Sequence, residues 1–177
     1  MAQICINTKN LREKIPEIHA GDEVYVSGTV YTARDAAHKR IKALIEQNKP
    51  LPFELDGACI YYAGPTPARP GFPIGSCGPT TSSRMDVYTP LLMEHGLLAM
   101  IGKGGRSNEV KQAIVKHGGI YLCAIGGAGA LAAMSVKSLE VIAFEELGCE
   151  SVKRLEVESF PVLCAIDCQG NSLFERN

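Results

Sequence analysis

Residues 97–130 read LLAMIGKGGRSNEVKQAIVKHGGIYLCAIGGAGA and contain two apolar runs separated by a polar, helix-like segment. Each apolar run ends in a glycine turn, and the segment between them has the apolar spacing of an amphipathic helix with a glycine stop. Buried strands that alternate with helices predict parallel pairing through right-handed crossovers. This part of the chain therefore indicates an α/β fold.

The flanking segments extend this pattern in both directions. Residues 21–33, GDEVYVSGTVYTA, alternate apolar and polar positions as a half-exposed strand does, and residues 34–48 predict a helix that stops at Lys49–Pro50. Further predicted elements are a buried strand at 58–64, a long Pro- and Gly-rich loop at 65–79, a Pro-interrupted helix at 83–96, and strands within 136–147, 152–160 and 161–171. Because short turns join the last three, we expect one α/β domain over residues 1–177 with a mixed, partly parallel sheet.

The composition is that of an ordinary globular protein. Apolar residues make up 46% of the 177 residues and charged residues 21%, with a net charge of −1. This balance provides no basic surface for nucleic acid and no cationic face for a membrane. No apolar run approaches the ~20 residues of a membrane span, and the first residues lack the order of a signal peptide, so we expect a cytoplasmic protein. The seven cysteines form no Cys-x-x-Cys pair, and their odd number without a secretion signal predicts free thiols. We expect no metal ligands in this chain.

Residues 78–86, GPTTSSRMD, combine a turn-making Gly-Pro with four successive hydroxyl side chains and an arginine. Hydroxyls at a helix start cap backbone N–H groups or act as donors, and Arg84 offers a bidentate fork for a carboxylate. Either threonine, Thr80 or Thr81, could alternatively be no more than an N-cap. The segment predicts an anion-binding helix start.

Two further strand-to-helix junctions carry cations. Lys103 and Arg106 flank the glycine turn GKGGRS at a helix start, and Arg34 lies at the junction in YTARDAAH. GKGGRS also approaches a dinucleotide fingerprint, but Ser107 replaces the third glycine and the next strand ends without an acid. The three junctions could converge at one edge of a parallel sheet, which points to a small di-anion. The alternatives are a surface ion pair for Arg34 and a solvated charge for Lys103.

At this point the sequence resembles a known family. The segments GPTTSSRMD, GKGGRS, KHGGIYLCAIGGAGAL, VKSLEVIAFEELG and EVESFPVLCAIDCQGN look like the β subunit, or C-terminal domain, of the class I (iron–sulfur) fumarate hydratases. YVSGTVYTARDAAHKR is similar to the start of that domain, so the resemblance spans nearly the whole chain. The β subunits of L-tartrate dehydratases share much of the pattern.

The resemblance implies a fold and a partner. Members have a swivelling β/β/α domain that closes over an α subunit carrying a [4Fe-4S] cluster, one iron of which binds substrate and acts as a Lewis acid. By the same resemblance none of the seven cysteines is a cluster ligand, so the chain is expected to be inactive alone. Homodimerisation of the α–β heterodimer is a further expectation.

The resemblance also implies roles for single residues. Arg34, Arg84 and Lys103 are expected to hold the carboxylates of fumarate or malate together with Thr81. Thr80 is the candidate base, although the sequence leaves open which of Thr80 and Thr81 faces the substrate. We add the hypothesis that Asp35 and His38, one helical turn apart, activate Thr80; such pairs are otherwise structural. Two alternative functions stay open, an L-tartrate dehydratase β subunit and a non-catalytic dicarboxylate-binding module.

Overall fold

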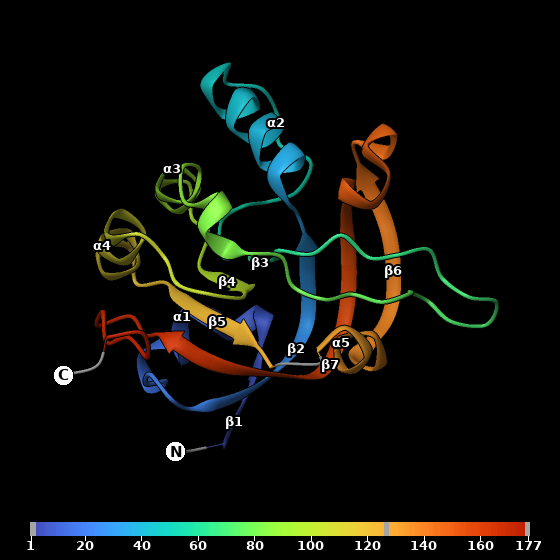
Figure 1. The fold of residues 1–177 in the computed structure, drawn as a ribbon. Coiled ribbons are helices and arrows are strands. Elements are labelled where there is room, and N and C mark those ends of the chain that lie inside the picture. Colours follow the sequence, from blue (N-terminus) through green and yellow to red (C-terminus); the bar gives the residue numbers. More distant parts are fainter. Residues whose placement is uncertain (1–2, 126–127, 176–177) are drawn as a thin grey trace.

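The structure is a computed structural model, and it describes residues 3–125 and 128–175. One mixed sheet and its surrounding helices make up the fold (Figure 1). The strands are β1 (Gln3–Asn7), β2 (Glu23–Thr32), β3 (Cys59–Tyr61), β4 (Ala99–Gly102), β5 (Ile120–Ala124), β6 (Val136–Ala143) and β7 (Val152–Ile166). The α-helices are α1 (Leu11–Lys14), α2 (Asp35–Glu46), α3 (Thr89–Glu94), α4 (Asn108–His117) and α5 (Ala128–Ser135). Short 3-10 helices are η1 (Thr8–Asn10), η2 (Ile15–Glu17), η3 (Ser82–Met85) and η4 (Glu145–Glu150).

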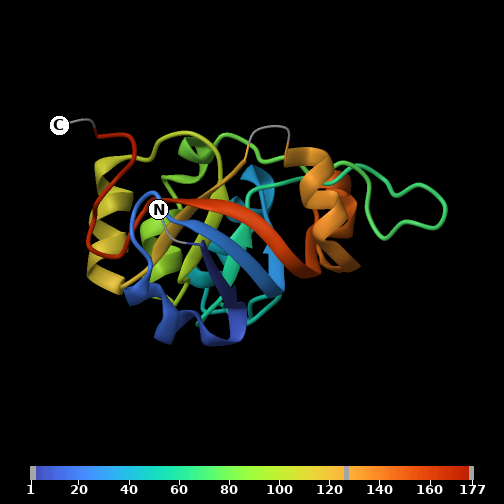
Figure 2. The same ribbon diagram turned by 90° about the horizontal axis from the view of Figure 1, so that it is seen from below.

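The sheet runs in the order β1-β2-β3-β4-β5-β7-β6, and β2 also pairs with β7. Strands β1 to β5 pair with one another in parallel, whereas β7 is antiparallel to β2, β5 and β6. Because β7 pairs with both β2 and β5, the sheet closes into a small barrel (Figures 1 and 2). The expected α/β class and the mixed, partly parallel sheet are confirmed.

Burial on both faces explains why the central strands are continuous apolar runs. One core includes Cys59 and Tyr61 of β3 and Ile101 of β4, together with the middle of β7 from Leu155 to Cys164. The alternate positions, Ile60 and Met100 among them, face a second core that is covered by α2, α3 and α4. The three helices therefore pack on the outside of the parallel strands, and their N-termini follow the strand ends.

Three elements differ from the sequence-based expectation. The two strands expected at 152–160 and 161–171 are one strand, β7, because Ser159 takes a positive φ of 52° and donates its N–H to Ser27 Oγ, after which pairing continues through Pro161. The helix expected at 83–96 is divided into η3 and α3, since Pro90 in the first turn of α3 favours a new start. Helix α5 was not predicted, because its residues are almost all small or apolar and show no helical period.

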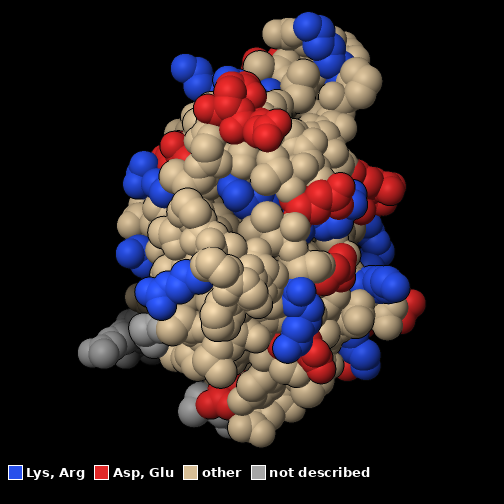
Figure 3. Space-filling model, turned by 90° about the vertical axis from the view of Figure 1, so that its right-hand side faces the viewer, with Lys and Arg blue, Asp and Glu red and all other residues tan. Residues whose placement is uncertain are grey.

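The long loop predicted at 65–79 is present and projects from the body of the protein (Figures 1 and 2). Cys77 near its end donates its backbone N–H to the carbonyl of Gly129 in α5. On the side from which the loop projects, acidic and basic side chains are interspersed around a largely uncharged centre (Figure 3). No helix in the described part of the chain is long and apolar enough to cross a membrane.

Candidate functional site

The carboxyl ends of β2, β3 and β4 lie side by side, since these strands are consecutive parallel neighbours. Arg34 follows β2 and Lys103 follows β4. The segment from Pro79 to Thr81 lies across the strand ends: the N–H of Thr80 donates to the Tyr62 carbonyl at 2.7 Å, and Thr81 forms a parallel bridge with Lys103. The three junctions singled out in the sequence therefore meet at one edge of the sheet, where open α/β folds bind ligands.

Two arginines and two acids lie together at this edge. Arg84 Nε donates to Asp35 Oδ1 at 2.9 Å, and Arg34 Nε lies 3.8 Å from Asp35 Oδ2. Glu150 Oε1 also approaches Arg34 Nε, at 3.9 Å. Arg34 was expected either to bind an anion at the strand edge or to form an ion pair with an acid. It lies at the strand edge and is paired with acids.

The hydroxyls of the GPTT segment are not used as caps. Thr81 is the N-cap residue of η3, but its side chain accepts no capping hydrogen bond. Among the described residues, no hydrogen bond engages the hydroxyl of Thr80 or Thr81. Thr81, Arg84 and Lys103 are exposed, and Thr80 is partly exposed. Polar side chains without protein partners at a strand edge are suited to binding a ligand.

The third hydroxyl, Ser82, has a different role from its neighbours. It is fully buried, and its Oγ accepts from the N–H of Lys103 at 3.0 Å, while the hydroxyl of Tyr121 lies 2.9 Å from it. Tyr121 also donates to the Gly104 carbonyl at 2.7 Å. A Cβ at Gly102 would overlap Ser82 Oγ, so only glycine permits this contact. Ser82 therefore ties the GPTTSS and GKGG turns into one rigid unit.

The prediction that Arg106, with Lys103, favours an anion at the GKGGRS turn is wrong. Its side chain is fully buried, donates to Asp86 Oδ1 at 2.6 Å and to Thr89 Oγ1 at 2.9 Å, and stacks on the ring of Tyr121. Burial alone would lower the pKa of Arg106, but the neighbouring Tyr62 and Asp86 outweigh it and the pKa is raised. A planar guanidinium with five donors is suited to such a buried network.

Side chains of the protein accept hydrogen bonds from the backbone N–H groups at the N-terminus of α4. Ser107 caps the helix by accepting from the N–H of Val110 at 3.3 Å, and Asp86 Oδ2 accepts from the N–H of Ser107 at 2.7 Å. Of the two cations in the GKGGRS turn, Arg106 is thus buried and paired, whereas Lys103 is exposed.

His38 lies beneath the site and not on its surface. The side chain is fully buried, and its Nδ1 lies 2.8 Å from the Arg34 carbonyl, which also accepts the backbone N–H of His38 at 2.9 Å. Since a carbonyl only accepts, Nδ1 carries the proton. Burial lowers the pKa of His38 to about 4, so the ring is neutral at pH 7. Its Nε2 has no hydrogen-bond partner among the described residues.

The cysteines do not form a site for an iron–sulfur cluster. All seven are free thiols, as predicted. Burial raises the pKa of Cys59 and of Cys77 to about 12, which opposes the thiolate form that a metal ligand requires. In the described ranges, no three His, Cys, Asp or Glu side chains gather so that they could hold a metal ion. The described residues of this chain therefore do not fit a cluster of their own.

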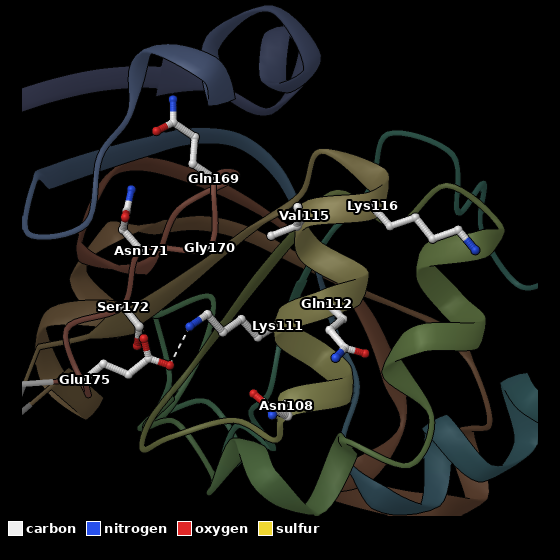
Figure 4. A pocket seen from close by; sticks show the side chains of 10 residues that line it. All are labelled: Asn108, Lys111, Gln112, Val115, Lys116, Gln169, Gly170, Asn171, Ser172 and Glu175. Atoms are coloured by element: carbon white, nitrogen blue, oxygen red, sulfur yellow. Dashed lines mark hydrogen bonds and ion pairs between the residues drawn. The ribbon is translucent and has the colours of Figure 1, made fainter.

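Two grooves lie apart from the candidate residues. One, of about 730 Å³, runs between α4 and the C-terminal segment, and an ion pair between Lys111 and Glu175 crosses it (Figure 4). The other, of about 820 Å³, lies between the long loop and α5 and includes the exposed side chains of Phe72 and Met134. None of the candidate site residues lines either groove.

Comparison with known proteins identifies the family of the chain. The family described as Fumarase C-terminus matches residues 1–177. The chain belongs to this family. An anaerobic class I fumarate hydratase of Escherichia coli is 42% identical over 170 residues, which cover 95% of this chain and 31% of that protein. Fumarate hydratase 2 of Leishmania major is 41% identical over 168 residues, which cover 94% of this chain and 30% of that protein.

The fumarase C-terminal family also includes proteins of this chain's size. A putative L(+)-tartrate dehydratase subunit beta of Methanocaldococcus jannaschii is 40% identical over 173 residues, which cover 94% of this chain and 89% of that protein. By contrast, the chain spans about a third of the length of the fumarate hydratases that it matches. The resemblance inferred from the sequence motifs is confirmed.

Some residues that shape the strand edge were not found from the sequence. Ser82 and Asp86 lie inside the GPTTSSRMD motif, but nothing in the motif separates a buried hydroxyl from exposed ones. Tyr121 lies in an apolar run and gives no signal at all. Glu150 is distant in the chain from every motif and reaches Arg34 only through the pairing of β7 with β2.

Proposed function

We propose that this chain is the β subunit of a hydro-lyase that reversibly hydrates fumarate to L-malate. Its part is to bind the two carboxylates and to supply a hydroxyl base, while an α subunit carries the [4Fe-4S] cluster. The relatives named as fumarate hydratases and the match of the whole chain to the Fumarase C-terminus family support the reaction class. Like the reaction itself, the partner subunit and a cytoplasmic location are proposals.

The observation that carries the proposal is the meeting of three cations at one strand edge with two threonine hydroxyls that form no hydrogen bond among the described residues. Arg34, Arg84 and Lys103 provide three positive charges against the carboxylates of Asp35 and Glu150. A small excess of positive charge that is organised by backbone bridges suits a dicarboxylate of four carbons. We assign Arg34, Arg84, Lys103 and Thr81 to carboxylate binding.

The chemistry explains why such a site needs fixed cations. Removing the proton beside a malate carboxylate places negative charge on that carboxylate as an aci-carboxylate. Cations aimed at those oxygens stabilise the transition state more than the ground state. Thr80 is the proposed acceptor of the proton, and a threonine hydroxyl needs nearby positive charge to act as a base. Lys103, bridged to the neighbouring Thr81, is the proposed source of that charge.

Asp35 and His38 are proposed to assist Thr80 indirectly. Asp35 orients Arg84 through its 2.9 Å ion pair, and His38 holds the backbone of Arg34 through the carbonyl that it binds. Since His38 is buried, its assistance acts through the position of Arg34 rather than by contact with the substrate.

The β subunit of an L-tartrate dehydratase is the second candidate. The similarity to the putative tartrate dehydratase subunit beta, which this chain matches over 89% of its length, favours a separate β subunit of this size. Tartrate differs from malate by one hydroxyl, so both substrates suit the same carboxylate-binding residues. A dicarboxylate-binding module without catalysis is the third candidate.

The test is an anaerobic assay of this chain with and without a reconstituted iron–sulfur α subunit. We expect hydration of fumarate and dehydration of L-malate in the mixture and not by either subunit alone. Turnover of tartrate in place of malate would transfer the chain to the tartrate dehydratases. A well-folded complex that turns over neither substrate, while the chain binds dicarboxylates, would contradict the enzymatic proposal.

A further inference from the structure

The ammonium group of Lys153 lies inside the turn between β6 and β7. Its Nζ donates to the carbonyls of Cys149 at 3.0 Å and Ser151 at 3.1 Å and to the Ser151 hydroxyl at 2.8 Å, with the Gly148 carbonyl at 3.3 Å. Burial lowers the pKa of Lys153, but an ammonium has three donors and these four acceptors surround it. Lys153 thus fixes the backbone of η4 to the start of β7.

This fixed turn lies beside the end of β2. Lys153 is the register partner of Thr32, and its N–H donates to Thr32 Oγ1 at 3.3 Å. Arg34 follows two residues later. The turn packs against the start of α2, and in Figure 1 it forms the short coil at the upper end of β6 and β7. Residues distant in the chain from the GPTT motif therefore form one wall of the candidate site.

The side chain of Arg34 lies in the narrow space beside Gly64 and the carbonyl of Cys149. A Cβ at Gly64 would lie 3.0 Å from the Cys149 carbonyl oxygen and 3.2 Å from Arg34 Cδ, so the glycine leaves the space that the arginine needs. At the end of this space, Asp35 Oδ2 and Glu150 Oε1 lie 3.8 Å and 3.9 Å from Arg34 Nε. All three atoms are buried and lack a hydrogen bond.

Both acids thus approach the Nε edge of the Arg34 guanidinium. Among the described residues, no hydrogen bond engages its two Nη groups. An arginine grips a carboxylate through two parallel N–H groups, so the plane of the guanidinium must be oriented before binding. An oriented side chain also loses less entropy when the ligand binds.

We propose that Glu150 is a positioning residue for Arg34. Together with Asp35 it holds the Nε edge, and the Lys153-bound turn holds Glu150, so that the Nη groups face one carboxylate of the substrate. The identity of that substrate rests on the proposed function, whereas the orientation of Arg34 does not. If Glu150 served only to balance charge, its removal would strengthen the binding of a dianion. The positioning role predicts the opposite, weaker binding.

The test compares Glu150→Gln with Glu145→Gln in the complex with the α subunit. Glu145 is exposed in the same turn, so its substitution removes the same charge without touching Arg34. Glu150→Gln is expected to raise the KM for L-malate and its dissociation constant by calorimetry about three- to fivefold, the size of one partly exposed ion pair. Glu145→Gln is expected to change neither. An unchanged or lower dissociation constant for Glu150→Gln overturns the proposal.

A second readout needs no substrate. In the chain labelled with ¹⁵N-arginine, the Nε–H signal of Arg34 is identified by its loss in Arg34→Lys, and its exchange with solvent is measured. Glu150→Gln is expected to accelerate this exchange severalfold, and Glu145→Gln is expected to leave it unchanged. If exchange depends on Glu150 but no variant binds malate, the positioning role stands and the proposed function fails. If malate binds normally and exchange ignores Glu150, this inference alone fails.

Discussion

Arg84 combines an ion pair to Asp35 with a partly exposed guanidinium that can bind a carboxylate. Its Nε is engaged by Asp35, and half of the side chain is exposed, at 51%. Replacement by lysine keeps the charge but removes the planar fork that can hold Asp35 and a carboxylate together. We therefore predict that Arg84→Lys in the complex raises the KM for L-malate about tenfold.

The matched control for this prediction is Arg40→Lys. Arg40, in α2, forms a similar surface ion pair with Glu146 of η4 and is not one of the candidate site residues. Steady-state kinetics should leave its KM at the wild-type value. Identical kinetics for Arg84→Lys and wild type would remove Arg84 from substrate binding.

His38 gives the fold a dependence on pH. Its pKa is about 4 in the folded chain, against about 6.5 in an unfolded one. As the pH falls from 6.5 to 4 the unfolded state takes up the proton first, so the free energy of unfolding decreases, by about 3 kcal/mol in all. Below pH 4 this contribution no longer changes. His38→Asn keeps an N–H donor for the Arg34 carbonyl but does not titrate, so it should lose this part of the dependence.

Urea denaturation at pH 7, 5.5 and 4 measures the effect. His95→Asn is the control, because His95 makes the same type of contact, to the Leu91 carbonyl, on the exposed surface. It should follow the wild type at each pH. A wild-type curve with the same pH dependence as His38→Asn would show that His38 is not the cause. Malate turnover of His38→Asn equal to wild type would separately exclude a role for His38 in catalysis.

At the scale of elements, the GPTTSS and GKGG turns act as one unit because Ser82 is enclosed between them. We predict that Gly102→Ala, which overlaps Ser82 Oγ and crowds the ring of Tyr62, lowers the free energy of unfolding by about 1–3 kcal/mol. Gly105→Ala is the matched control in the same turn, since a Cβ there meets nothing within 4 Å. Urea denaturation of both variants checks this. Equal stabilities would mean that the two turns are not coupled through Ser82.

The sequence predicted the central elements well, for physical reasons. Strong apolar runs, glycine stops and Lys49–Pro50 located β2, α2 and the β4–α4–β5 unit, and parallel pairing brought Arg34, Arg84 and Lys103 to one edge. The sequence did not reveal that Arg106 is buried, because pairing with Asp86 depends on packing between η3 and α4. It also did not reveal the turn at Glu150, which depends on the closure of the barrel by β7. Helix α5 has no polar face and so no period to detect.

At the scale of the whole molecule, barrel closure divides the candidate site into two walls. The GPTT segment supplies the threonines, the turn after β4 supplies Lys103, and the turn held by Lys153 supplies the acid beside Arg34. The chain corresponds to about a third of the fumarate hydratases that it matches and to nearly all of a subunit beta. Our proposed view, that this domain provides carboxylate binding and the base while the remainder of the enzyme lies in a partner, is consistent with these proportions.

The rate of L-malate dehydration by the reconstituted complex tests that view at Thr80. Thr80→Val removes the proposed base, whereas Thr81→Val removes the neighbouring hydroxyl by the same change in shape. We predict that Thr80→Val lowers kcat at least ~100-fold with little change in KM, the size expected for loss of a general base. Thr81→Val should mainly raise KM. Wild-type kcat in both variants would contradict the claim that this chain supplies the base.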